Sequence, residues 1–370
     1  MRLSHFVLLS GSISASLPGV LGWGAAGHEI VATIAQIHLH PSVYPALCDI
    51  LNYTSPDPRA PPCRLAPIAA WADRLRYKMR WSSPLHYVGA VDDYPSQTCE
   101  FPGSGGWAGE RRRNVLGAVR NVTDILEDYA DGGGSVGYAT ANEAAKFLVH
   151  FMGDLHMPLH LTGRDRGGND DKVRFGGRIT NLHALWDGLL IAKAIRETPS
   201  NYSVPLASPQ IEWVLRGAIY DSYVRRIMWE GVLDQWKDEI PSWVACPAPA
   251  RAYGGGGLWQ TVMRVFGRDV AGETDDEVLC PYHWAAPIHA LNCEIVWPKA
   301  LDEPPYKNTS RIGEYAPRGG PYLELDTPEY AGVIKERLIV EKLLAQAGIR
   351  LAAVLNWLFA ETDGLNVVEI

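Results

Sequence analysis

The chain has 370 residues, of which 47% are hydrophobic and 21% charged, and its formal net charge is −8. This composition is typical of an ordinary globular protein, and no stretch beyond the N-terminal segment is apolar for long enough to span a bilayer. The acidic balance argues against a protein that grips duplex nucleic acid by broad charge neutralisation. It leaves room for a nuclease whose phosphate contacts come from bound cations.

Residues 1–22 are predicted to be a secretory signal, with Arg2 as its positive start and Gly22 as a small residue at the cleavage point. Cleavage there frees the α-amine of Trp23, five residues before His28. An amine and an imidazole that close can bind the same metal ion. The alternative is that Trp23 only begins a buried helix. We expect a secreted, soluble monomer with no membrane or protein partner.

Apolar residues at helical spacing predict a mainly α chain. The predicted helices cover 23–40, 67–80, 110–130, 141–157, 181–197, 211–236 and 329–360. Gly167-Gly168-Asn169 and Phe175-Gly176-Gly177 are predicted to be turns of a short β-hairpin. Residues 41–66 are rich in proline and residues 239–330 are punctuated by proline and glycine, and both are predicted to be loops, while 81–109 is predicted to be irregular.

Cysteines and sequons both suit an exported protein. Six cysteines follow the predicted signal, an even number that favours disulfides, and none forms a CxxC pair, which argues against a cysteine-zinc site. Six cysteines allow 15 pairings. The cysteines are Cys48, Cys63, Cys99, Cys246, Cys280 and Cys293. The predicted glycosylation sites are Asn52, Asn121, Asn201 and Asn308.

Two histidine–aspartate pairs form the densest chemistry of the chain. His150 and Asp154 are four residues apart, as are His183 and Asp187, so a helix places each pair on one face. Imidazole nitrogens combined with carboxylate oxygens are typical of zinc sites. One such pair is common by chance, but two pairs together with further histidines favour a metal centre. The further histidines are His28, His86 and His160.

These segments resemble the zinc-dependent single-strand nuclease family of fungi and plants, which is related in fold to bacterial zinc phospholipase C. They occur in order along the chain. They are Trp23-Gly-x-x-Gly-His28, Trp71-Ala-Asp73-x-x-Arg76, Leu85-His86-Tyr87, His150-x-x-x-Asp154-x-His156-x-Pro-Leu-His160, Gly167-Gly168-Asn169, Asn181-Leu-His183-x-x-Trp186-Asp187, Trp284-Ala285 leading to Cys293, and Gly348-x-Arg350-Leu351-Ala352-x-x-Leu355-Asn356.

The resemblance implies one compact multi-helix domain over 23–360 with a short hairpin, insertions at about 45–65 and 239–325, and a tail at 361–370. It also implies three zinc ions. The first is held by Asp73, His86, His150 and Asp154; the second by His160, His183 and Asp187; the third by the amine and carbonyl of Trp23, by His28 and by the other oxygen of Asp154. His156 lies on a different helical face and is interpreted as structural.

The activity implied is hydrolysis of single-stranded DNA and RNA to 5′-phosphorylated nucleotides, with removal of phosphate from 3′-nucleotides. A zinc-bridging hydroxide attacks phosphorus, so Asp73 and Asp154 act through the metals. Arg76 contacts phosphate and supports the transition state. Tyr87 stacks on an unpaired base and Asn169 contacts it, which explains a preference for single strands.

One position departs from the family pattern. Gly89 stands where the family has a base-binding aspartate three residues after the ligand histidine. We expect base recognition to be weakened or rebuilt with Asp92 or Asp93, and we expect Gly89→Asp to restore the usual preference.

The resemblance also implies a Cys99–Cys293 disulfide. Proximity in the chain then suggests Cys48–Cys63 and Cys246–Cys280.

Two other functions stay open at this point. A zinc phospholipase C would use the same metals. A secreted protein that binds zinc and nucleotide without turnover would also keep the ligands.

Overall fold

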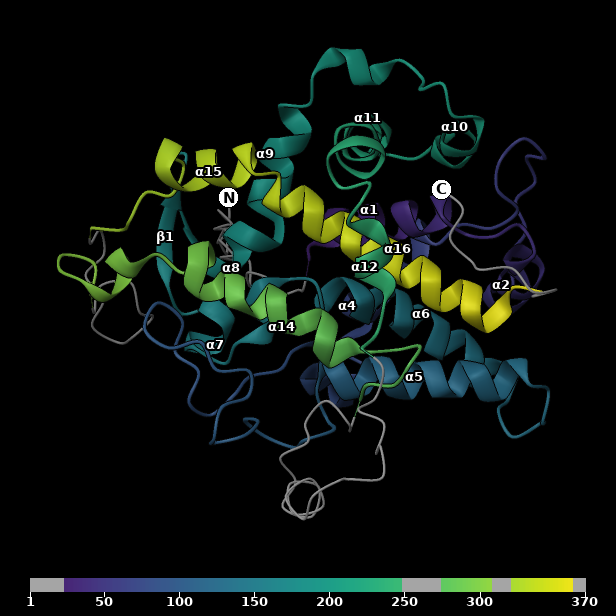
Figure 1. Cartoon of the computed structure of the whole chain (residues 1–370), viewed down its shortest axis with the longest axis horizontal. Helices are drawn as coiled ribbons and strands as arrows, with labels where there is room; N and C mark the ends of the chain where they lie inside the picture. The colour runs from purple at the N-terminus through teal and green to yellow at the C-terminus, as the bar shows by residue number, and fades with distance from the viewer. Residues whose placement is uncertain (1–22, 248–273, 308–320, 362–370) are drawn as a thin grey trace, which may run out of the picture.

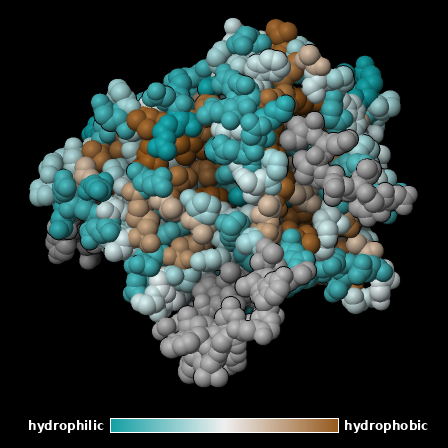
Figure 2. Space-filling view, in the orientation of Figure 1, coloured by the Kyte–Doolittle hydropathy of each residue, from teal (hydrophilic) through white to brown (hydrophobic). Residues whose placement is uncertain are grey.

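The computed structural model describes residues 23–247, 274–307 and 321–361, and it is built mainly of helices (Figure 1). The predicted signal, the Asn308 sequon and most of the predicted tail lie outside these residues. No helix in the described ranges is both long and apolar enough to cross a membrane. Figure 2 shows one face, on which hydrophilic residues predominate and apolar residues show between them.

The longest helix, α16 (Ile339–Phe359), runs through the middle of the molecule and is buried along most of its length (Figure 1). It packs against α1 (Ala25–Ile37) at Gly348. A Cβ at Gly348 would lie 2.6 Å from Ile34 Cγ2 and 3.0 Å from the Val31 carbonyl oxygen. Glycine is therefore needed there for the two helices to approach this closely.

Helices α5 (Val115–Ala130) and α6 (Tyr138–Asp154) pack against each other and against α16. Asn114 caps α5, since its side-chain oxygen accepts hydrogen bonds from the backbone N–H groups of Leu116 and Gly117. The buried C-terminal half of α6 places its last two turns in the core. Those turns carry His150 and Asp154.

A single hairpin was predicted and is present among the described residues. Strands β1 (Lys172–Phe175) and β2 (Arg178–Asn181) pair antiparallel through a two-residue Gly176-Gly177 turn, in which both glycines have positive φ. Residues 167–169 also form a turn, with positive φ at Gly167 and Gly168, but this turn closes the short segment α7 (Asp165–Gly168) and lies before the hairpin.

The proline-rich regions contain helices that the loop prediction missed. In 41–66, α2 (Val43–Leu51) buries an apolar face. In 239–330, α12 (Ile240–Val244) and α14 (Pro281–Leu291) each have proline in the first turn, where its missing N–H costs nothing. Proline marks a helix start at these positions.

The predicted helices are otherwise present, but several of them are shorter than predicted or divided into separate elements. The helix expected at 67–80 ends at Leu75, and that at 329–360 is interrupted at Leu338, where φ is 50°. The remaining elements are α3 (Ala66–Ala69), α4 (Trp71–Leu75), η1 (Arg80–His86), η2 (Pro158–Leu161), α8 (Leu182–Ala184), η3 (Leu185–Leu189), α9 (Leu190–Arg196), η4 (Ser200–Ser203), α10 (Pro209–Leu215), α11 (Asp221–Arg226), η5 (Ile227–Gln235), η7 (Asn292–Val296), η8 (Lys299–Asp302), η9 (Pro328–Gly332) and α15 (Val333–Glu336).

Three disulfides are present. They join Cys48 to Cys63, Cys99 to Cys293 and Cys246 to Cys280, which are the three pairs expected from the sequence. The second pair spans 194 residues and ties the irregular segment after η1 to η7.

Candidate functional site

Asp154 is the centre of a buried histidine cluster. Its Oδ2 lies 3.3 Å from His150 Nε2, one turn earlier on α6, and 2.9 Å from His86 Nδ1. Its Oδ1 lies 3.5 Å from His28 Nε2 and 3.4 Å from His160 Nδ1. One carboxylate therefore faces imidazoles from four separate parts of the chain, which is the arrangement of a carboxylate shared between metal sites.

All eight predicted side-chain ligands fall into groups whose donor atoms lie within 4.8 Å of one another. His28 comes from α1, Asp73 from α4, His86 from the end of η1, and Asp187 from η3. The groups are His28 with His150 and Asp154; Asp73 with His86 and His150; and His160 with His183 and Asp187. Residues far apart in sequence thus converge as the motif pattern predicts.

Three of the imidazoles are oriented by backbone carbonyls. The Nδ1 atom of His150 lies 2.8 Å from the Ala69 oxygen, and that of His183 lies 2.7 Å from the Gly167 oxygen. His160 Nδ1 makes the same kind of bond. A ring that donates Nδ1–H to a carbonyl presents an unprotonated Nε2, the form that binds a metal.

Several polar atoms at this centre are buried without a hydrogen-bond partner. They include His150 Nε2, Asp154 Oδ1 and Asp187 Oδ1. Burial, reinforced by the charges of Asp73 and Asp154, raises the pKa of Asp187 well above its usual value. Such atoms are costly to bury unless something binds them. Nitrogen and carboxylate donors arranged this way fit zinc.

The environment also shifts the pKa values of two residues of the cluster that line the cavity, Asp73 and His86. Burial is the largest influence on Asp73 and raises its pKa, although the charge of His150 opposes this. Burial alone lowers the pKa of His86, but its hydrogen bond to Asp154 and the charges of both aspartates together raise it.

Trp23 lies beside the same cluster. Its side chain is fully buried, and the next residue, Gly24, donates its N–H to the Asp187 carbonyl oxygen at 2.8 Å. The start of the described chain is therefore tied to the segment that carries one of the ligands.

A cavity of about 450 Å³ opens over the cluster. Tyr87 is 50% exposed, which leaves its ring accessible from the cavity. Arg76 is half-buried, and its Nη2 donates to the Tyr77 hydroxyl at 2.9 Å. Asn169 is buried and donates to the Arg166 carbonyl at 2.7 Å. The lining residues are Asp73, Arg76, Ser83, His86, Tyr87, Leu159, His160, Thr162, Gly163, Arg166, Gly167, Asn169 and His183.

His156 is structural, as predicted. Its Nδ1 donates to the Met152 carbonyl at 2.7 Å, and its Nε2 accepts from Arg350 Nη1 at 2.7 Å. Burial, with the charge of Arg350 adding to it, lowers the pKa of His156 well below its usual value. The pair joins α6 to α16.

The structure disfavours two of the expectations built on Gly89, the fit of an aspartate there and a base contact from Asp92 or Asp93, whereas altered base preference stays a prediction. A Cβ at Gly89 would lie 2.8 Å from the backbone nitrogen of Gly163 and 2.9 Å from its Cα, so an aspartate does not fit without movement of the backbone. Asp92 and Asp93 do not line the cavity. Asp92 Oδ2 accepts from the Gly105 N–H at 2.8 Å, and Asp93 is buried in a network of its own.

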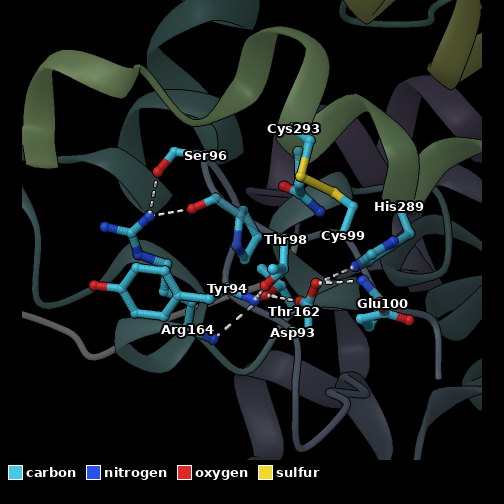
Figure 3. The surroundings of a disulfide bond; sticks show 12 residues. Asp93, Tyr94, Ser96, Thr98, Cys99, Glu100, Thr162, Arg164, His289 and Cys293 are labelled. Carbon is cyan, nitrogen blue, oxygen red and sulfur yellow. Dashed lines mark hydrogen bonds and ion pairs between the residues drawn. A yellow bond between two sulfur atoms is a disulfide. The ribbon is translucent and has the colours of Figure 1, made fainter. Parts of the chain in front are cut away.

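Figure 3 shows that network, which reaches the cavity lining through Thr162. Asp93 Oδ1 accepts from the Glu100 N–H at 3.1 Å and lies 3.0 Å from His289 Nε2. Its Oδ2 accepts from the hydroxyl of Thr162, which lines the cavity. His289 was assigned no role from the sequence, because its position in the chain matched no ligand spacing.

Arg164 forms a second anchor next to Thr162. Its guanidinium lies between the rings of Tyr94 and Trp297, at 4.0 and 4.3 Å from their centroids. Its Nη2 donates to Asp302 Oδ1 at 2.6 Å. The insertion expected at 239–325 thus supplies His289 and Asp302 to the support of the cavity wall.

Comparison with known proteins agrees with this geometry. The S1/P1 Nuclease family model matches residues 23–360. Endonuclease 4 of Arabidopsis thaliana is 28% identical over 92% of this chain and 91% of its own length, and Nuclease S1 of Aspergillus oryzae is 28% identical over 90% and 91%. Endonuclease 2 of Arabidopsis thaliana is 32% identical over 62% of this chain and 70% of its own. The chain belongs to the S1/P1 nuclease family and is a hydrolase of phosphodiester bonds.

Proposed function

We propose that this protein is a secreted, zinc-dependent nuclease that cleaves single-stranded DNA and RNA to 5′-phosphorylated nucleotides and also removes phosphate from 3′-nucleotides. The observation that carries the proposal is the convergence of eight histidine and aspartate side chains, with unpartnered buried polar atoms. Four of them line a cavity that also presents Arg76 and Tyr87.

Three zinc ions are proposed for this centre. Zinc bound there supplies a Lewis acid that polarises phosphoryl oxygens and activates water at neutral pH. The proposed ligands are Asp73, His86, His150 and Asp154 for one ion; His160, His183 and Asp187 for another; and the amine and carbonyl of Trp23, His28 and Asp154 for the third.

The protein's own groups orient the substrate. The guanidinium of Arg76 lies at the cavity and offers several N–H donors to a phosphate, where negative charge grows in the transition state. Tyr87 offers an exposed ring face on which a base stacks. A base inside a duplex has no free face, so stacking on Tyr87 favours single strands.

Secretion is supported by three disulfides and by exposed sequons. Disulfides persist in oxidising compartments, and Asn52, Asn121 and Asn201 are exposed. Cleavage after residue 22 would create the Trp23 amine that the third zinc site requires. N-terminal sequencing of the secreted protein tests this point: a start at any other residue contradicts it.

The activity is tested with the secreted protein on denatured DNA, RNA, a 3′-nucleotide and phosphatidylcholine, before and after chelation and zinc repletion. We expect zinc-restored release of 5′-nucleotides and of phosphate. Release of phosphocholine without nuclease activity would assign the site to a phospholipase. Full zinc occupancy with no turnover of any substrate would instead support a binding protein.

A further inference from the structure

A second arginine lines the cavity and has no role in the family pattern described above. Arg166 lies on α7, directly before Gly167, whose carbonyl orients the ligand His183. Among the described residues that line the cavity, Arg76 and Arg166 are the two that carry a permanent positive charge. Arg76 is half-buried beside the metal ligands, whereas the side chain of Arg166 is 72% exposed. Arg166 is therefore the cation at the cavity's outer edge.

The backbone at Arg166 is unusual. Arg166 has a φ of 57° and Asp165 a φ of 45°, and both are followed by glycines with positive φ. Left-handed backbone costs a residue with a side chain roughly 1–2 kcal/mol, and glycine or asparagine adopts it more easily. Strain of this kind gathers at functional sites. The arginine here thus points to a use for its side chain.

The turn is also held at both ends. Arg164, two residues earlier, lies over the ring of Tyr94 (Figure 3) and over the ring of Trp297. The Asn169 amide donates to the Arg166 carbonyl at 2.7 Å. The backbone that carries Arg166 is therefore anchored, and its long side chain is the part that can swing.

We propose that Arg166 binds a phosphate of the nucleic acid strand next to the scissile phosphate and so makes the enzyme favour polynucleotides over mononucleotides. The inference rests on the proposed nuclease function. In the structure, Arg166 Nη1 lies 3.2 Å from Asp170 Oδ1. An exposed ion pair is worth about 0–1 kcal/mol, so a phosphate competes with Asp170 readily. A mononucleotide has no second phosphate and cannot use this contact.

The test compares kcat/KM for a single-stranded oligothymidylate with kcat/KM for a 3′-nucleotide. Arg166→Asn removes the charge and keeps a residue that tolerates left-handed backbone. We expect oligonucleotide kcat/KM to fall about three- to tenfold and 3′-nucleotide kcat/KM by less than about twofold. The log–log salt slope for the oligonucleotide should weaken by about 0.7. Arg166→Lys should keep the slope, and Asp170→Asn should raise oligonucleotide kcat/KM.

Arg59→Asn is the matched control. Arg59 is 75% exposed and pairs with Asp57 at 3.1 Å, but it lies outside the cavity lining. The Arg59→Asn variant should have the wild-type kcat/KM for both substrates and the wild-type salt dependence. Equal losses on both substrates for Arg166→Asn, or no loss on either, would overturn the inference. Failure of the wild-type protein to turn over either substrate with zinc would overturn the proposed function instead.

Discussion

Two buried histidine–aspartate clusters in this molecule have similar composition, but they differ in whether their polar atoms have hydrogen-bond partners. Around Asp154, several donor atoms have no hydrogen-bond partner. Around Asp93, both carboxylate oxygens are paired, with His289 and the Glu100 N–H on one and with Thr162 on the other. The second cluster also has a nearby cysteine, but Cys99 is bound in a disulfide and cannot ligate a metal.

The comparison shows that pairing, more than composition, distinguishes a metal site from a structural network. A buried polar group with all its bonds made rigidifies the fold, whereas one without partners destabilises it unless a ligand binds. If the first cluster binds cations as proposed, its unpaired donors lower stability until the cations bind. The second contributes stability on its own.

Chelation should therefore separate the two clusters most strongly. Removal of zinc leaves the donors around Asp154 buried and unpaired, so we expect activity to fall to background. The apparent free energy of unfolding should fall by about 2.7 kcal/mol for each site that had been filled at 100 times its Kd. Hydrolysis assays and denaturant unfolding, with and without added zinc, measure both effects. Full activity in excess chelator would contradict the assignment.

Substitution of one ligand should change stability in opposite directions with and without zinc. Asp187→Asn removes a buried carboxylate whose Oδ1 is unpartnered. Loss of a group that merely orients a ligand costs about 10- to 100-fold, so loss of the ligand should lower kcat/KM at least about 100-fold. In chelator at neutral pH, the variant should be about 1–2 kcal/mol more stable than the wild type, because burial raises the pKa of Asp187 and a carboxyl with a raised pKa destabilises the folded state above its unfolded-state pKa. Urea unfolding in chelator at neutral pH checks the sign; a less stable variant would contradict this linkage argument.

The corresponding substitution in the cluster around Asp93 should lower the stability of the protein. Asp93→Asn keeps the shape of the side chain but replaces an acceptor oxygen by an amide, so at least one of its present donors loses its partner. We expect the free energy of unfolding to fall by about 1–3 kcal/mol in zinc and in chelator alike. Zinc content, measured by atomic spectroscopy, should be unchanged. A loss of zinc from this variant would show that the cluster is not an independent support.

The convergence of the eight histidine and aspartate residues could be predicted from the sequence because their spacing is local and their motifs are ordered. His150 with Asp154 and His183 with Asp187 follow helical geometry, and the family resemblance joined them to distant residues such as Asp73. The Asp93 network could not be predicted, because His289 lies 196 residues away and only the fold brings it close.

Proline explains most of the errors in the fold. Pro281 was interpreted as part of a loop, but it occupies the first turn of α14, where a proline is tolerated. The helix break at Leu338 could not be predicted, because a leucine adopts the left-handed backbone there and neither proline nor glycine occupies the position. Local composition therefore predicted the strongly periodic helices, but it missed helices in the proline-rich regions and the break at Leu338.

The smallest effects concern Gly89 and Gly163, which pack against each other at the cavity wall that the Asp93 network supports. A Cβ at Gly89 meets the Gly163 backbone at 2.8 Å, whereas a Cβ at Gly163 meets Gly89 Cα at 3.8 Å, an ordinary contact. Gly89→Ala should lower the free energy of unfolding by about 1–3 kcal/mol, because backbone atoms cannot yield as a flexible side chain can. Gly163→Ala should change it by less than about 0.5 kcal/mol. Denaturant unfolding of the two variants measures the difference, and equal stabilities would mean that the wall relaxes around the added methyl group.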